Sequence, residues 1–198
     1  MFIIFKRIFD ITFSILLLLI FSPLLILSLI MIILLDLQYP LFIQERSGLN
    51  GKSILIIKLK TMRSSGDNKQ ITLLGKFLRF SKIDEIPQLI NVLKNDMSII
   101  GPRPLYKEFN NYYIDKHKLR ISVKPGLTGL AQVKVRDSTD WFKKFNFDTI
   151  YVKKANYNLD FYILFKTFSI VFNSIFKKKH RAIESIDYKR SFFENYCK

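Results

Sequence analysis

The amino-acid sequence predicts an α+β fold that is predominantly helical with a small β element, preceded by an N-terminal re-entrant membrane helix hairpin. Three observations predict it. Positions 11–35 form a long uncharged apolar run that a Ser-Pro pair interrupts at its midpoint. Residues Ser53–Leu59 have the composition of one buried strand, and apolar residues at helical spacing follow Pro87. The 198 residues suffice for one domain with a short appendage.

The apolar run extends from Ile11 to Leu35, long enough for a helix to cross a bilayer core of about 30 Å. Pro23 removes the hydrogen bond to the Leu19 carbonyl, so we expect a kink at the Ser22-Pro23 pair, where either the Ser22 hydroxyl or a neighbouring helix can satisfy the exposed backbone groups. Each half of the run is about 17 Å long, roughly one leaflet. Two half-length limbs favour a re-entrant segment. A spanning helix that tolerates its proline is the alternative.

Basic residues stand on both sides of the apolar run. Lys6 and Arg7 precede it, and further lysines and arginines follow from Arg46 onward. The positive-inside tendency would keep both ends in the cytoplasm. We therefore expect a re-entrant membrane helix at 1–40, a cytoplasmic domain with interfacial helices at 41–176, and a basic C-terminal tail at 177–198.

The chain is strongly basic, with 32 Lys and Arg against 16 Asp and Glu and a net charge of +16. A basic face suits anionic lipid, a nucleotide diphosphate or nucleic acid, but a composition rich in Lys, Ile, Asn and Phe throughout explains the charge equally well. The single cysteine, Cys197, excludes an internal disulfide. With two distant histidines, His117 and His180, beside it, a zinc site is not expected.

Turn signals and apolar runs mark the remaining elements. Gly48 and the pair Asn50-Gly51 predict turns before the strand, and Lys124–Leu127 (KPGL) predicts a type II turn. Phe161–Phe176 is apolar with one lysine and too short to span a bilayer. It is either an interfacial helix with a basic tail or a buried core helix.

The stretch Ser81–Leu105 contains the most chemistry. Pro87 suits the first turn of a helix, because its missing N–H has no intrahelical partner there. Helical spacing then predicts one apolar face, made of Leu89, Ile90 and Leu93.

Two acids and one arginine flank this predicted helix. Asp84 and Glu85 stand at or just before its N-terminus, where the helix dipole favours ionised carboxylates. Arg103 lies between two prolines that favour extended geometry, and a guanidinium held this way suits bidentate capture of phosphate. Taken separately, such acids usually cap a helix, and such an arginine often pairs with a surface acid.

Together these residues resemble a family signature. Asp84–Pro104, DEIPQLINVLKNDMSIIGPRP, is similar to the DELPQ…NVL.GDMS.VGPRP pattern of the bacterial sugar transferase family, the small monotopic phosphoglycosyl transferases. Lys58–Met62 (KLKTM) resembles the family's KFRTM segment, and 124–133 (KPGLTGLAQV) resembles its KPGITGLAQV. The resemblance covers about residues 6–176.

The chain departs from the family pattern at two places. Lys60 stands where the family's KFRTM segment has an arginine, and lysine is not equivalent to arginine if that position has to make a bidentate contact. Val135 stands where the family has a glycine, and valine does not easily adopt positive φ, so the shape of this loop is in question. Arg136 keeps the place expected for a phosphate contact.

The resemblance also implies roles for the polar residues. Asp84 would be the catalytic nucleophile, and Glu85 would be the second catalytic carboxylate and the ligand of Mg²⁺. The groups implied to bind the phosphates are Lys58, Arg79, Arg103 and Arg136.

The implied reaction transfers a sugar-1-phosphate from a UDP-sugar to polyprenyl phosphate, with undecaprenyl phosphate expected, through an aspartyl-phosphosugar intermediate. UMP is released, in the first membrane step of surface glycoconjugate synthesis. Residues 41–176 would be the catalytic domain, on the cytoplasmic face of the bacterial inner membrane. The partners would be the UDP-sugar, polyprenyl phosphate and membrane lipid, without nucleic acid.

The alternative is a non-catalytic basic module that binds a membrane surface or nucleic acid. The carboxylate pair distinguishes the two hypotheses, because such a module would avoid acids at the centre of its basic face. The sequence has no Asp-x-Asp pattern, which argues against an ordinary nucleotide-sugar glycosyltransferase.

Overall fold

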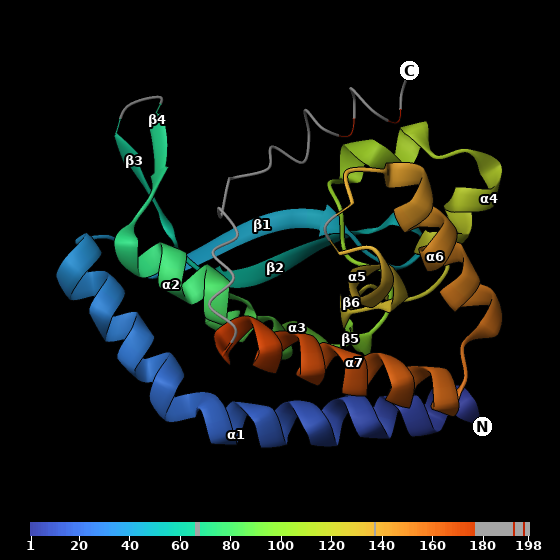
Figure 1. Ribbon diagram of the computed structural model, residues 1–198, viewed down its shortest axis with the longest axis horizontal. Helices are drawn as coiled ribbons and strands as arrows, with labels where there is room; N and C mark the ends of the chain where they lie inside the picture. The colour runs from blue at the N-terminus through green and yellow to red at the C-terminus, as the bar shows by residue number, and fades with distance from the viewer. Residues whose placement is uncertain (66–67, 137, 177–191, 193–195, 197–198) are drawn as a thin grey trace.

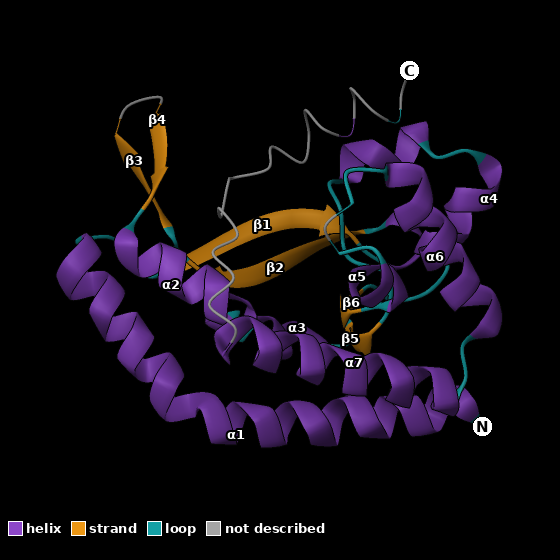
Figure 2. Cartoon of the chain, viewed as in Figure 1, coloured by secondary structure: helices purple, strands orange, loops and turns teal. Residues whose placement is uncertain are grey.

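The computed structural model describes residues 1–65, 68–136 and 138–176, together with Phe192 and Tyr196. Its helices are α1 (Phe2–Asp36), α2 (Leu73–Ser81), α3 (Gln88–Leu93), α4 (Asp115–Lys118), α5 (Leu130–Lys134), α6 (Trp141–Lys154) and α7 (Tyr157–Phe176). Short 3-10 helices are η1 (Leu49–Gly51), η2 (Ile83–Glu85), η3 (Lys107–Tyr112) and η4 (Leu119–Ile121). Figure 2 shows that helices dominate, so the predicted α+β class with a small β element is confirmed.

Within the described residues the strands pair as three two-stranded sheets. The antiparallel ribbon of β1 (Leu41–Ser47) and β2 (Ser53–Leu59) crosses the middle of the molecule, and β2 has the bounds predicted from the sequence. Strands β3 (Met62–Ser65) and β4 (Asn68–Ile71) form an antiparallel hairpin at one side. Strands β5 (Ser98–Ile100) and β6 (Gly126–Thr128) are parallel.

Helix α1 lies along one side of the molecule, with α7 beside its N-terminal half (Figure 1). Aromatic pairs join the two helices, with Phe9 against Phe161 and Phe13 against Phe168. The main apolar core is enclosed between these helices, the β1-β2 ribbon and α6. Its fully buried members are Ile56, Leu89, Val92, Met97, Ile99, Ile100, Leu130, Tyr151 and Ile163.

The proline of α1 has the expected local effect. Pro23 lies inside a helix that continues to Asp36, and α1 bends about half-way along its length (Figure 1). The Ser22 hydroxyl donates to the Leu19 carbonyl oxygen at 2.9 Å, as predicted, because proline supplies no N–H to that oxygen. The two limbs form one continuous bent helix. By length and composition α1 is able to cross a membrane.

The buried face of α3 differs from the predicted one. Leu89 is buried as expected, but Ile90 is exposed, and the buried residues also include Val92 and two polar ones, Gln88 and Asn91. The physical reason is that α1 and β2 pack against this six-residue helix from different sides, so its buried arc is wider than a single apolar stripe. Pro87 directly precedes α3 with φ −59°.

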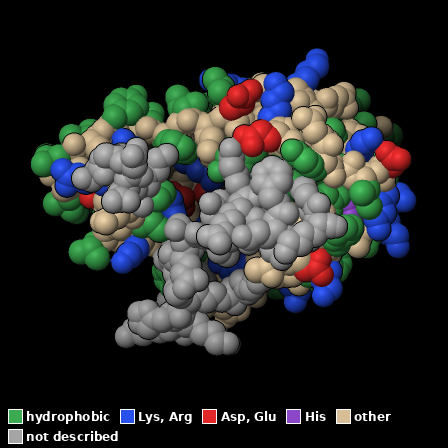
Figure 3. Space-filling model, turned by 90° about the horizontal axis from the view of Figure 1, so that it is seen from above, with side chains coloured by type: hydrophobic (Ala, Val, Ile, Leu, Met, Phe, Trp, Pro, Cys, Tyr) green, Lys and Arg blue, Asp and Glu red, His purple; other side chains and the backbone are tan. Residues whose placement is uncertain are grey.

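Helix α7 has one buried face and one exposed apolar face. Ile163 on its inner face is fully buried, while one outer face carries a row of exposed aromatic residues at helical spacing, namely Phe161, Phe165, Phe168 and Phe172. Apolar residues along α1 and at Leu73 and Phe77 of α2 are also exposed. The face seen in Figure 3 carries scattered Lys and Arg side chains, a few Asp and Glu side chains, and hydrophobic side chains among them.

The basic tail predicted at 177–198 lies outside the described residues, apart from Phe192 and Tyr196. Phe192 stacks on Phe109 with ring centroids 3.8 Å apart, and it also packs edge-on against Trp141. The Tyr196 hydroxyl is 2.7 Å from Nδ1 of His117. These residues belong to a second, aromatic cluster built on η3 and α6.

Candidate active site

Three separate segments bring charged side chains to one place. Strand β2 carries Lys58 near its end, η2 carries Asp84 and Glu85, and the loop after β5 carries Arg103. Lys82 joins α2 to η2 in the left-handed conformation, with φ 64°, and this sharp reversal places the two acids one short turn before α3.

Glu85 is held between two cations. Its Oε1 accepts a hydrogen bond from Arg103 Nη2 at 2.7 Å and another from Lys58 Nζ at 3.0 Å. The Glu85 side chain is only 16% exposed, and burial alone would raise its pKa. Arg103 and Lys58 outweigh that effect and lower the pKa of Glu85 well below its usual value. Glu85 is therefore ionised throughout the physiological range.

Asp84 lies next to it in a different environment. The residue is 8% exposed, and Oδ1 has no hydrogen-bond partner among the described residues. Burial, and then the negative charge of Glu85, raise the pKa of Asp84 to about 6, although Lys58 and Lys82 oppose the change. The site thus holds one carboxylate bound by two cations and one with an oxygen that accepts no hydrogen bond from the described residues.

Burial also affects the lysine. Desolvation lowers the pKa of Lys58, and the charge of Glu85 restores part of the loss. A cation paired with Glu85 can also reach an anionic ligand that approaches the pair.

Arg79 lies in the same neighbourhood but contacts a different residue. Its Nε donates to Thr61 Oγ1 at 2.8 Å, and its positive charge is the smallest of the effects that shape the pKa of Asp84. The effect of Arg79 on Asp84 is therefore electrostatic, and the hydrogen bond of Arg79 goes to Thr61.

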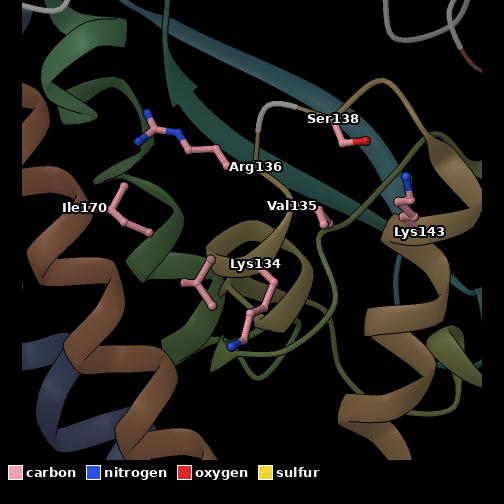
Figure 4. A pocket seen from close by; sticks show the side chains of 7 residues that line it. Lys134, Val135, Arg136, Ser138, Lys143 and Ile170 are labelled. Carbon is pink, nitrogen blue, oxygen red and sulfur yellow. The ribbon is translucent and has the colours of Figure 1, made fainter.

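Arg136 is not part of this cluster in the described residues. It lines an open cavity of about 480 Å³ with Val133, Lys134, Val135, Ser138, Lys143 and Ile170 (Figure 4). The side chains of Arg136, Lys134 and Lys143 point in different directions in that view. Val135 has φ −133°, so this loop has no need of the glycine that the family places there.

The loops that carry Arg103 and Arg136 nevertheless start side by side. Arg103 lies in the loop after β5, and Arg136 follows α5, the short helix after β6; these two parallel strands end together, where Gly101 N–H donates to Thr128 O at 2.8 Å. A Cβ at Gly129 would stand 2.2 Å from Gly101 O, so only glycine permits this approach. Ligands of parallel sheets commonly bind at such carboxyl ends.

Two further residues, Lys82 and Arg120, lie near the site without having been predicted from the sequence. Lys82 acts electrostatically on both acids, and its place two residues before Asp84 was an available signal. Arg120 is buried, pairs with Asp148 at 3.1 Å, and donates from Nη2 to the Arg103 carbonyl oxygen at 2.7 Å. No sequence pattern indicated this second contact.

The two carboxylates also fit the expected metal. No group of three or more His, Cys, Asp and Glu side chains occurs in the described parts of the chain. Mg²⁺ usually needs only one or two carboxylates when substrate phosphates supply the other oxygens. The ionised carboxylate of Glu85, the ligand implied by the resemblance, suits such a donor set.

Comparison with known proteins gives a consistent set of relatives. The profile of a family described as bacterial sugar transferase matches residues 1–174. The uncharacterized sugar transferase EpsL of Bacillus subtilis (strain 168) is 40% identical over 168 residues, covering 80% of this chain and 83% of that protein.

Two relatives have more specific names. UDP-glucose:undecaprenyl-phosphate glucose-1-phosphate transferase of Caulobacter vibrioides is 41% identical over 142 residues, 65% of this chain and 53% of that protein. Undecaprenyl-phosphate galactose phosphotransferase of Salmonella typhimurium is 35% identical over 191 residues, 84% of this chain and 40% of that protein. The matched region spans about half the length, or less, of these two proteins.

Proposed function

Because the chain belongs to the bacterial sugar transferase family, we propose that it transfers a sugar-1-phosphate from a UDP-sugar to undecaprenyl phosphate and releases UMP. The observation that carries the proposal is the pair Asp84 and Glu85. Asp84 presents an unpartnered buried oxygen, directly beside a carboxylate that Lys58 and Arg103 keep ionised. A basic module for lipid or nucleic acid would have no use for such an arrangement.

The residues suit a displacement in two steps. A carboxylate oxygen of Asp84 attacks the phosphorus that bears the sugar, and the bond from that phosphorus to the UMP oxygen breaks, so UMP leaves with the electron pair. A phosphate oxygen of the lipid then attacks the same phosphorus, and the bond to Asp84 breaks. The carboxylate is regenerated and polyprenyl-diphosphate-sugar is formed.

Lys58 and Arg103 supply the positive charge that phosphoryl transfer requires. Both bind Oε1 of Glu85, so this carboxylate holds the two cations on one side of the site. Glu85 would also hold Mg²⁺, which when bound would neutralise part of the negative charge of the diphosphate. Arg136, at its separate cavity, would contact a phosphate of whichever substrate extends there.

The contacts of α1 support a monotopic, re-entrant topology on the cytoplasmic face of the inner membrane. Near its start, Arg7 donates to the carbonyl oxygens of Val92 and Leu93 at 2.7 and 2.9 Å, and Asp10 accepts from the Ile99 N–H at 2.9 Å. At its end, Asp36 accepts from the Thr72 hydroxyl at 2.8 Å. Both ends of the helix thus bind the same domain, which favours placing them on one side of the bilayer.

The experiment that tests the proposal is UMP release by the purified protein in detergent or nanodiscs, with Mg²⁺, undecaprenyl phosphate and a panel of UDP-sugars. We expect UMP with at least one donor, and a loss of several orders of magnitude in Asp84→Asn. Intact mass should show a sugar-phosphate adduct in the wild type and none in the variant. Normal UMP release by Asp84→Asn would refute the role of Asp84.

A further inference from the structure

Asn91 is a buried polar residue of α3 that the proposed chemistry does not use. Its side chain is 1% exposed. The amide nitrogen Nδ2 donates to the Leu55 carbonyl oxygen at 2.7 Å, and Oδ1 accepts from the Ile57 N–H at 3.1 Å. One amide group therefore satisfies a donor and an acceptor of the β2 backbone.

These two backbone groups lie on the edge of β2 that no strand covers. Strand β2 pairs with β1 along its other edge, and the described sheet ends there. Leu55 and Ile57 are two residues apart, so their carbonyl and N–H point to the same side, as they would toward a third strand. The Asn91 amide takes the place of that strand and joins β2 to α3.

The hydrogen bonds of Asn91 connect the two segments that carry the Lys58–Glu85 ion pair. Lys58 directly follows Ile57 in β2, while Glu85 lies in η2, which leads into the helix that carries Asn91. The Lys58–Glu85 contact of 3.0 Å depends on where β2 stands relative to η2 and α3. We propose that Asn91 is a positioning residue that aligns Lys58 with Glu85 by hydrogen bonding the edge of β2.

The inference rests on the proposed function, because Lys58 and Glu85 matter to turnover only if the site transfers a phosphosugar. The geometric claim can still be tested without turnover. A double-mutant cycle with Lys58→Met and Glu85→Gln, measured by denaturant unfolding, gives the coupling between the two side chains. The same cycle is then repeated in an Asn91→Ala background.

We expect a favourable coupling in the wild-type background and a coupling within error of zero in the Asn91→Ala background. Thr149→Val is the matched control, because it also removes a side-chain hydrogen bond to a backbone carbonyl, the bond of 3.1 Å from Thr149 to Lys116 O. Thr149 lies on α6, outside the elements that carry Lys58, Glu85 and Asn91. Thr149→Val should lower stability and leave the coupling intact. If Asn91→Ala does not fold, Asn91→Asp replaces it, since this variant keeps the shape and the acceptor for Ile57 but loses the donor to Leu55.

Activity gives a second readout. Asn91→Ala should lower kcat by about 10- to 100-fold with little change in KM, as expected when a supporting contact is lost. In a Lys58→Met background the same change should have no further effect, because the residue that it positions is gone. Thr149→Val should keep the wild-type kcat.

An unchanged Lys58–Glu85 coupling in the Asn91 variant, with stability lowered only as in Thr149→Val, would overturn the inference. The inference would also be overturned if Asn91→Ala lowered kcat by the same factor in the Lys58→Met background as in the wild type. If the wild type releases no UMP, the proposed function fails, while the unfolding cycle still decides the role of Asn91.

Discussion

Asp84 and Glu85 are neighbours in the chain, yet the pKa values of their carboxyl groups move in opposite directions. Glu85 Oε1 receives hydrogen bonds from Lys58 and Arg103, whereas Asp84 Oδ1 has no partner in the described residues. Burial raises both pKa values, but Arg103 and Lys58 outweigh it at Glu85, whereas the negative charge of Glu85 adds to it at Asp84. This separation of pKa values is the pattern expected of two carboxylates that serve different roles, as proposed above.

The first prediction concerns the pH dependence of turnover. The pKa of Asp84 is raised to about 6, and only its ionised form can attack phosphorus, so kcat/KM should rise between pH 5 and 7 and level off above that. Lys58→Met should move the midpoint to higher pH, because the Lys58 charge lowers the pKa of Asp84. Initial rates of UMP release in buffers of constant ionic strength measure the pH profile of the wild type and the shift of its midpoint in Lys58→Met. A rate independent of pH between 5 and 7 would contradict the assignment.

The second prediction is that Asp84→Asn stabilises the protein. The folded-state pKa of about 6 exceeds the usual 3.8, so protonated Asp84 contributes stability below pH 4, and this contribution disappears as the pH rises to 6. At pH 8 the variant should gain at most about 3 kcal/mol in unfolding free energy, and the gain should shrink toward pH 4. Denaturant unfolding at both pH values tests this. Asp115→Asn, at an exposed carboxylate, is the control and should show no gain at pH 8.

The third prediction is metal dependence. EDTA should abolish UMP release, and Mg²⁺ or Mn²⁺ should restore it, because the proposed donor set consists of carboxylate and phosphate oxygens. Glu85→Gln should weaken the apparent affinity for Mg²⁺ in a titration of the rate, while Cys197→Ser should leave it unchanged. Full activity in EDTA after removal of bound metal would refute the requirement.

The fourth prediction concerns the topology of α1. Single cysteines at Ile3 and Lys52, in a Cys197→Ser background, should both be protected from a membrane-impermeant thiol reagent in intact cells and react after permeabilisation. Position 52 is chosen because Lys52 has an extended backbone with φ −62°, which cysteine adopts easily, whereas the nearby Asn50 has φ 54°, which cysteine adopts poorly. Replacing Ser22 and Pro23 by leucines restores full backbone hydrogen bonding and favours a straight span.

In this double-leucine variant the cysteine at position 3 should become reactive in intact cells, and the one at position 52 should stay protected. Labelling of position 3 in the otherwise wild-type sequence would show that the helix spans the membrane. The contacts of Arg7 and Asp10 with α3 and β5 would then have to break.

The fifth prediction concerns Arg120. Arg120→Met leaves the buried Asp148 without its cation and should cost roughly 3–5 kcal/mol. Adding Asp148→Asn should recover part of that stability. It should not recover turnover, because the Arg103 carbonyl would still lack its donor, and Arg103 would bind Glu85 less well. Unfolding curves and UMP release on both variants give the comparison, and full recovery of turnover would show that Arg120 serves stability alone.

The sequence by itself determined the features that depend on neighbours in the chain. Apolar composition and turn signals predicted the strand Ser53–Leu59 with its correct bounds, and the Ser22-Pro23 pair predicted the bend of α1 and offered the Ser22 hydroxyl as a donor to Leu19. The DEIPQ and GPRP motifs identified Asp84, Glu85 and Arg103 before any contact was known. Local steric and hydrogen-bonding rules suffice for such features, since each involves residues close in sequence.

Only the tertiary structure decided how these residues combine. Lys58 and Arg103 lie 27 and 18 residues from Glu85 in the chain, and packing selects them as its partners while Arg79 binds Thr61 and Arg136 lines a separate cavity. Packing of α1 and β2 around α3 likewise exposes Ile90 and buries Asn91. A pKa depends on burial and on charges brought close by the fold, so no local pattern could have shown that the pKa of Asp84 is raised while that of Glu85 is lowered.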